Sequence, residues 1–317
     1  MLTLLAVSLL SAQVDIGAIT AARDDVQLKA IADTLNLFLA EPIVPRKRIG
    51  GVIEVRNELA AERVFSSGPF AIGTRPVPPE VLVALRTAWR DDNPRVGVEA
   101  LYAFGVLAVQ PSGAERHALL PASGPELVAL TGTRDPMLRY AAIRVIGRVF
   151  AARAGDPPLD PMVGDALIAK LNDGDAAMRT VAMEALGSVR DERAAQGLAE
   201  LFEYHGRTRE GDAALDALAH IAHSSSAPVF KAALNGKSTV QRVIAIEGLG
   251  RIGDASALPA VRAAADRDRS DAVALAASFA DAKLANGGTT AISDALTRPR
   301  LRDQAQGYLN ELAQPGR

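Results

Sequence analysis

The sequence of 317 residues contains no cysteine and few aromatic residues. Without cysteine, the chain can form neither disulfides nor thiolate metal sites, and it has no thiol nucleophile. Aromatic residues make up 4% of the chain although 49% of it is hydrophobic, so the core must consist mainly of Ala, Leu, Val and Ile. Small aliphatic side chains let helices approach closely, and Ala and Leu favour helix formation. The composition therefore favours closely packed helices.

The chain also lacks an excess of charge of either sign, because its net charge is −2. A surface that binds nucleic acid is usually basic, since neutralised phosphates supply much of the affinity. The one compact basic cluster, Arg46-Lys47-Arg48, is interpreted as a solvated loop between helices. We therefore expect no nucleic-acid partner.

Long hydrophobic runs are missing too, and this predicts that the chain does not span a membrane. The run from Leu2 to Leu10 is shorter than the roughly 20 residues that a membrane-spanning helix needs. It is followed by Ser11-Ala12-Gln13, a pattern typical of a signal peptide cleaved after Ala12. We expect residues 1–12 to be this signal peptide and the protein to be exported, either periplasmic or secreted. The lack of Lys and Arg in this run leaves an alternative, a first structural helix in a cytoplasmic protein.

What the sequence does contain is an internal repeat of seven segments. Positions are counted from the first residue of each segment, which is position zero. Position three is usually Ala, position seven is apolar, and position eight is usually Gly or Ala. Positions three and seven lie on one helix face, which indicates a helix packed against its neighbours. The segments start at Gly97, Arg139, Arg179, Gly211, Arg242, Ala272 and Arg302. Five are preceded by residues that commonly cap helix N-termini, namely Asn93, Asp135, Asp175, Ser238 and Asp268.

Each repeat helix is preceded by a second amphipathic segment, and the turns between the two are short and polar. Short turns place antiparallel helices side by side, so the sequence predicts helix pairs. The helices that precede the repeat helices are expected to cover residues 79–89, 125–131, 163–171, 194–203, 227–234, 257–265 and 289–296. The first two repeats are longer, and their extra residues, 110–124 and 153–160, are predicted to be loops because they are rich in Pro, Gly and Ser. No stretch alternates with a period of two, so no sheet is expected.

Two segments carry a resemblance to a known repeat. Arg179-Thr-Val-Ala-Met-Glu-Ala-Leu-Gly187 and Arg242-Val-Ile-Ala-Ile-Glu-Gly-Leu-Gly250 resemble the short HEAT repeat of phycobilisome-lyase-type proteins, Arg-x-x-Ala-x-x-Ala-Leu-Gly. The resemblance covers about residues 79–313 and implies an all-α fold, a right-handed α-solenoid of HEAT-type helix pairs. It implies little about function, because this repeat occurs in enzymes, lyases and adaptors alike.

The predicted organisation has two parts after the signal peptide. Residues 79–317 are expected to form the HEAT-repeat solenoid of about seven helix pairs. Residues 13–78 fit the repeat poorly and are expected to be an atypical N-terminal helical cap, with helices over 21–39 and 51–65. A separate small domain is the alternative for this segment.

At the fifth position, counted from the first residue of the segment as zero, four of the seven segments carry a charged residue that points away from the packed face. These fifth-position residues are candidates for contact with a protein partner: Arg144, Glu184, Asp216 and Glu247. The arginines that open four of the repeats could bind an anion, but we expect them to tie adjacent repeats together through nearby Asp residues. These are Arg139, Arg179, Arg242 and Arg302.

One constellation could carry metal chemistry. Four polar side chains lie on a single stripe of the predicted helix, and carboxylates with imidazoles can hold a divalent metal. They are Asp212, Asp216, His220 and His223. The simpler interpretation is a polar exposed helix face.

Other catalytic patterns are missing from the sequence. There is no Gly-x-Ser-x-Gly motif, and no His-Glu dipeptide of the kind used by deoxyhypusine hydroxylase, a HEAT-repeat di-iron enzyme. Gly236-Lys237-Ser238-Thr239 is not a P-loop, because Lys231 stands where its first glycine should be. The sequence therefore predicts a monomeric, non-catalytic scaffold with no cofactor and an unidentified protein partner. The alternative is a metal-binding protein or metal-dependent enzyme that uses the Asp/His stripe.

Overall fold

The computed structural model describes residues 14–40, 60–66, 73 and 75–314. The expected signal peptide, the Arg46-Lys47-Arg48 cluster and most of the helix expected over 51–65 lie outside these residues. The described residues form α-helices, with short 3₁₀ helices and no β-strand among them. The all-α class is therefore confirmed.

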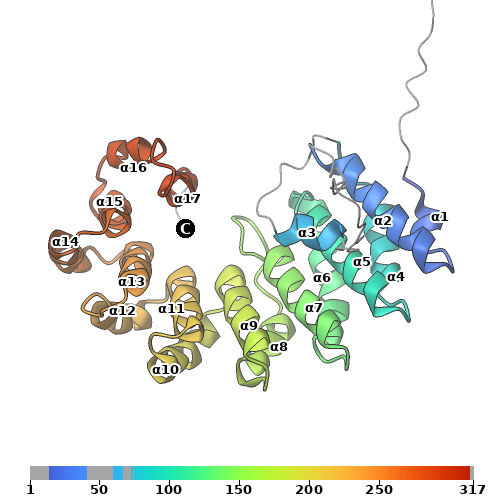
Figure 1. The fold of residues 1–317 in the computed structure, drawn as a ribbon, viewed down its shortest axis with the longest axis horizontal. Helices are drawn as coiled ribbons and strands as arrows, with labels where there is room; N and C mark the ends of the chain where they lie inside the picture. Colours follow the sequence, from blue (N-terminus) through green and yellow to red (C-terminus); the bar gives the residue numbers. More distant parts are fainter. Residues whose placement is uncertain (1–13, 41–59, 67–72, 74, 315–317) are drawn as a thin grey trace, which may run out of the picture. The chain divides into compact units, whose positions relative to one another are not determined.

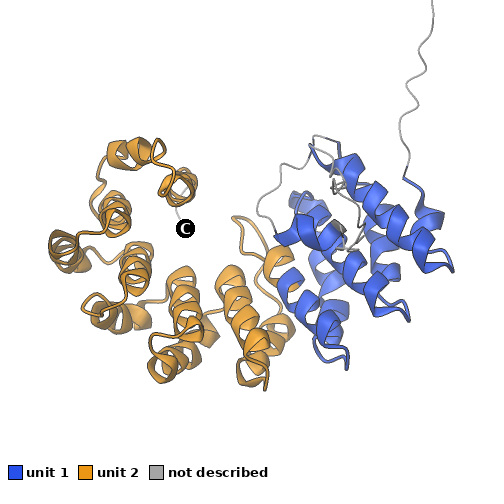
Figure 2. Ribbon diagram, viewed as in Figure 1, with its two compact units in different colours: residues 1–145 blue, residues 146–317 orange. Residues whose placement is uncertain are grey.

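The chain divides into two compact units, residues 1–145 and 146–317 (Figure 2). The boundary falls within α7, whereas the repeat pattern places a division at residue 78. Unit 1 contains α1 (Ile16–Ile19), α2 (Asp24–Phe38), α3 (Ala60–Ser66), α4 (Pro79–Ala88), α5 (Pro94–Leu107), α6 (Gly113–Thr131) and most of α7 (Pro136–Val149). The helix expected over 21–39 is confirmed as α2.

Unit 2 is built from five helix pairs in succession (Figure 1). Their first helices are α8 (Pro161–Ala169), α10 (Ala195–His205), α12 (Ala227–Ala233), α14 (Leu258–Arg267) and α16 (Thr290–Ala295). Their second helices are α9 (Ala176–Val189), α11 (Arg209–Ile221), α13 (Thr239–Ile252), α15 (Asp271–Ala285) and α17 (Arg302–Leu312). Within this unit, the first helices lie on the outer side of an arc and the second helices on its inner side, so we call the latter the inner helices. This pairing confirms the predicted HEAT-type architecture.

The small residue at position eight of the repeat lets successive inner helices pack closely. A Cβ atom added to Gly187 would lie 3.0 Å from the Cα of Ala217 on the next inner helix. A Cβ atom added to Gly250 would lie 3.2 Å from the Cα of Ala280. Both distances are tighter than ordinary van der Waals contact with a backbone atom, so a larger residue would push the helices apart.

Helix starts follow the predicted caps at four positions and differ at the fifth. The side chains of Asn93, Asp135, Asp175 and Ser238 accept hydrogen bonds from backbone N–H groups in the first turns of their helices. Asp268 does not cap α15, which begins at Asp271 after Ser270. The carboxylate of Asp268 instead pairs with Arg242 from the preceding repeat, at 2.7 Å, and accepts a hydrogen bond from the N–H of Ser270.

The loop expected over 110–124 is wrong, because α6 begins at Gly113 and continues through Pro121 and Pro125. Proline inside a helix costs about 3 kcal/mol. Burial of Leu120 and Leu127, seven residues apart on one face, offsets part of this cost, since each buried leucine contributes about 1.5–3 kcal/mol. The other long insertion, 153–160, contains no helix, as predicted.

Candidate binding pocket

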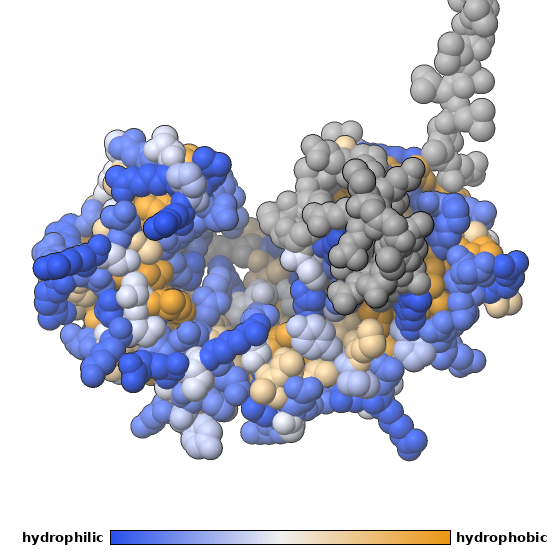
Figure 3. Space-filling model, viewed as in Figure 1, coloured by the Kyte–Doolittle hydropathy of each residue, from blue (hydrophilic) through white to orange (hydrophobic). Residues whose placement is uncertain are grey.

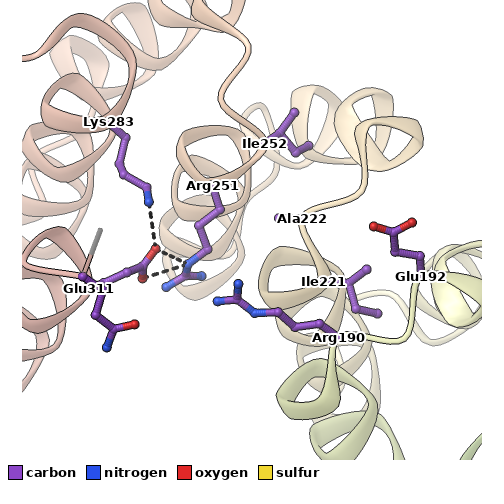
Figure 4. Close-up of a pocket in the computed structure, with 9 residues that line it drawn as sticks. Arg190, Glu192, Ile221, Ala222, Arg251, Ile252, Lys283 and Glu311 are labelled. Atoms are coloured by element: carbon purple, nitrogen blue, oxygen red, sulfur yellow. Dashed lines mark hydrogen bonds and ion pairs between the residues drawn. The ribbon is translucent and has the colours of Figure 1, made fainter. Parts of the chain in front are cut away.

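A pocket of about 360 Å³ lies in unit 2, at the C-terminal ends of the inner helices (Figure 4). Every inner helix contributes to it, either from its last turns or from the residues that follow, although the helices are far apart in sequence. Charged side chains make up most of the lining. The lining residues are Arg190, Glu192, Ile221, Ala222, Arg251, Ile252, Lys283, Glu311 and Gln314. Helix C-termini carry partial negative charge, which favours the cations placed there.

The centre of the pocket wall is an ion-pair network around Arg251. The Arg251 Nε lies 3.1 Å from a carboxylate oxygen of Glu311, and its Nη1 lies 3.5 Å from Glu247. The Lys283 Nζ lies 3.5 Å from the other oxygen of Glu311. The guanidinium also stands over the Phe279 ring, 5.7 Å from its centroid, and only 10% of the Arg251 side chain is exposed. Arg251 is therefore a largely buried cation held in one position.

Tyr308 on α17 completes this network. Its hydroxyl donates a hydrogen bond to Glu247 and accepts one of 2.6 Å from Gln304, and its ring stacks on Phe279 with centroids 4.5 Å apart. Burial, together with the negative charge of Glu247, raises the pKa of Tyr308 far above its usual value. The phenol therefore stays protonated and remains a hydrogen-bond donor to Glu247.

The four fifth-position residues fall into two kinds of environment. Arg144 and Glu247 are held within the fold. The Arg144 Nη1 lies 3.2 Å from the Ser66 Oγ and 3.3 Å from the Tyr102 hydroxyl, and its guanidinium stands over three rings, those of Phe65, Tyr102 and Tyr140. Burial raises the pKa of Tyr102 to about 12, although the charge of Arg144 acts to lower it. The Glu247 side chain is only 13% exposed.

Glu184 and Asp216 are accessible in contrast. Glu184 is exposed on α9, and 43% of the Asp216 side chain is exposed on α11. Both lie on inner helices that also contribute to the pocket. Of the four predicted partner-binding residues, these two are the more exposed to solvent.

The structure separates two members of the predicted Asp/His stripe and keeps the other two together, because the His220 Nδ1 lies 3.5 Å from a carboxylate oxygen of Asp216. Asp212 accepts a 2.7 Å hydrogen bond from Gln241 on α13, while the His220 Nδ1 lies 3.0 Å from the backbone oxygen of Asp216. Ala222 adopts a left-handed conformation that ends α11, so His223 lies beyond the helix and caps the 3₁₀ helix Ser224–Ser226. Among the described residues, no three acidic or histidine side chains are grouped to hold a metal ion.

Two of the four repeat-opening arginines tie adjacent repeats together. Arg242 does so through an Asp residue, as predicted, whereas Arg179 uses a glutamate. Arg179 donates to the backbone of its own turn and to Glu210 of the next repeat, at 2.8 and 2.7 Å. Arg242 does the same with Gly236 and Asp268, at 2.9 and 2.7 Å. Arg139 and Arg302 donate to carbonyl oxygens of the preceding turn.

The repeat pattern did not single out the pocket residues Arg190, Lys283 and Glu311. Their signal was weak, a charged residue one to three positions after the small residue of position eight, and it is visible only once the repeat is aligned. A membrane-spanning segment was not expected, and none of the helices that the structure describes is both long and apolar enough to be one.

The paired helices define the class of the protein, an α-solenoid. The HEAT repeats family matches residues 124–213, and the PBS lyase HEAT-like repeat matches residues 241–267. The chain therefore contains HEAT repeats, and the resemblance seen in its sequence is confirmed. No curated protein sequence matches it.

Solved structures show a likeness in fold. An engineered protein is similar with a TM-score of 0.51 and 19% identity, over 95% of this chain and 74% of that chain. The complex of CpcE and CpcF of phycocyanin lyase from Nostoc sp. PCC7120 gives a TM-score of 0.44 and 16% identity, over 94% and 92% of the two chains. At these identities the first likeness concerns the fold alone, and the second is too distant to support an argument.

Proposed function

We propose that the protein is a non-catalytic scaffold that binds a protein partner along the inner helices of unit 2. The observation that carries this proposal is the pocket, to which all five inner helices contribute. HEAT solenoids present extended surfaces of this kind to their partners. The exposed carboxylates of Glu184 and Asp216 extend the polar surface along α9 and α11.

The character of the surface supports a polar interface. Figure 3 shows that the viewed face of unit 2 is mostly hydrophilic, with its hydrophobic residues in small separate groups. Charged residues on a binding surface increase the specificity and the rate of association more than the affinity. A partner bound through such a surface should therefore show a salt-dependent association rate.

The experiment is a crosslinking pull-down from the native cell with the full chain as bait. The test variant carries Glu184→Lys and Asp216→Lys on the inner helices. The matched control carries Glu203→Lys, because Glu203 is an exposed acidic residue on the outer helix α10. We expect a reproducible partner that the test variant loses and the control retains. Equal capture by all three baits would contradict an interface on the inner helices.

Export is part of the same proposal and rests on the sequence of residues 2–12. N-terminal sequencing of the recovered bait tests it. A mature chain that starts at Gln13 supports export, whereas an intact N-terminus in the cytoplasmic fraction contradicts it.

A further inference from the structure

The cations that line the pocket already bind one carboxylate of the chain itself, which indicates the kind of ligand that the pocket can accept. Glu311 reaches from α17 to Arg251 on α13 and Lys283 on α15. Arg190, which follows α9, adds a third cation to the lining. In Figure 4 the side chains of Arg190 and Arg251 both extend into the space between α11, α13 and α17. Three cations from three inner helices therefore face one cavity.

The two cations that bind Glu311 have further N–H donors for a ligand. An ammonium group has three N–H donors, and a guanidinium has five. Among the described residues, Lys283 makes one ion pair, and Arg251 makes its ion pairs through Nε and Nη1, which leaves Nη2. Because Arg251 is buried and fixed by Glu247, Glu311 and Phe279, it would lose little conformational entropy on binding another carboxylate.

We propose that this pocket binds a carboxylate side chain of an acidic peptide segment, between Arg190, Arg251 and Lys283. The inference rests on the proposed scaffold function and names the chemistry of its partner. Glu311 competes for two of the three cations, so α17 weakens binding in the free protein.

The lining favours a peptide over a small metabolite. Small-molecule sites are lined mainly by apolar and aromatic side chains that cover most of the ligand. Here, among the residues that the structure describes, the apolar lining is limited to Ile221, Ala222 and Ile252, and none of the lining residues is aromatic. Glu192 and Glu311 also lie in the lining and repel a carboxylate, and the chain as a whole carries a net charge of −2. Attraction of an acidic segment must therefore be local to the three cations.

The test is fluorescence anisotropy of the full chain with a labelled oligoglutamate peptide, and with an oligoglutamine peptide of the same length as a neutral probe. Glu311→Gln should tighten oligoglutamate binding roughly fivefold, because it frees both cations. Lys283→Met and Arg190→Gln should each weaken it by a similar factor. The control is Lys237→Met, which removes the same charge from an exposed turn.

Several results would overturn the inference. One is oligoglutamate binding no tighter than oligoglutamine to both the wild type and Glu311→Gln. Another is a loss in Lys237→Met as large as in Lys283→Met, which would indicate general charge attraction. Competition by free glutarate at concentrations equal to the peptide would assign the pocket to a small carboxylate instead. If the peptide fails while the cellular partner still depends on Glu184 and Asp216, this inference fails and the scaffold proposal stands.

Discussion

Arg242 performs two tasks with one guanidinium. Its Nη1 donates to the Gly236 carbonyl oxygen and closes its own turn, while its Nε donates to Asp268 of the next repeat. Both side chains of the pair are largely buried, at 18% and 10% exposed. Burial acts to raise the pKa of Asp268, but hydrogen bonds from Arg242 and the Ser270 N–H leave it below its usual value. Ionised Asp268 therefore stabilises the folded state.

Removing this arginine should cost stability in a pH-dependent way. We expect Arg242→Leu to lower the free energy of unfolding by about 2 kcal/mol near neutral pH, because Asp268 keeps its charge without its partner. A folded pKa below the unfolded value gives stability above about pH 4, which is lost as the pH falls through the folded pKa. The difference between variant and wild type should shrink there. Urea denaturation across pH measures it, with the exposed Arg269→Leu as control, and a pH-independent difference would contradict the ion-pair argument.

Two glycines inside helices predict opposite effects of the same substitution. A Cβ at Gly248 would lie 2.5 Å from the ring of fully buried Phe230, whereas a Cβ at Gly307 would meet no atom within 4 Å. Alanine gains about 1 kcal/mol over glycine in a helix. Gly307→Ala should therefore raise the free energy of unfolding by about 0.5–1 kcal/mol, and Gly248→Ala should lower it by about 1–3 kcal/mol through overpacking. Denaturation midpoints decide this, and stabilisation by both changes would show that Phe230 can move aside.

The sequence predicted side-chain direction better than side-chain environment. The helical period correctly placed Glu184 and Asp216 on an exposed face. It also placed Arg144 and Glu247 on that face, but α3 with α5 covers the first and α17 the second. A periodic pattern reports one helix and its neighbours, so it does not reveal which distant helix comes to cover a position.

At the scale of elements, α17 makes contacts beyond its neighbouring pair. Tyr308 and Glu311 reach Glu247 and Arg251 on α13, two repeats back along the chain. Among the described helices, the pair α16 and α17 has one adjacent repeat, and a repeat packed on one side only is prone to local opening. These contacts anchor the final pair, α16 and α17, to the inner side of unit 2.

Loss of the phenol hydroxyl should loosen this anchor locally. We expect Tyr308→Phe to speed amide hydrogen exchange in α16 and α17 roughly tenfold, since a hydrogen bond to a charged carboxylate contributes about 1.5 kcal/mol. Exchange in α9 and α11 should change little. Tyr204→Phe is the control, because Tyr204 is 84% exposed. Equal acceleration in all four helices would mean that the variant destabilises unit 2 as a whole.

At the scale of the whole molecule, the repeat columns were enough to predict the class of fold. Small residues at position eight, polar caps and short turns each predict contacts between neighbouring helices, and a solenoid is largely the sum of such contacts. The pocket was not predictable in this way. Arg190 and Gln314 both line the pocket, although they belong to the first and the last of the five helix pairs. Their proximity depends on the curvature of unit 2, to which each repeat contributes a small rotation.

The contacts made by the Asp/His stripe give a prediction for the effect of metal ions on the melting temperature. Binding to the native state raises the melting temperature by an amount that grows with the logarithm of the ligand concentration relative to its Kd. In the Asp/His stripe, Asp212 is hydrogen-bonded to Gln241, and His223 lies past the end of α11, so a metal ion would have to break both arrangements. We expect added Zn²⁺, Fe²⁺ or Mn²⁺ to shift the melting temperature of the full chain by less than about 1 °C, which corresponds to well under 1 kcal/mol for a chain of this size. A rise of several degrees that disappears in Asp216→Asn with His220→Ala would instead establish a metal site on α11 and revive the enzymatic alternative.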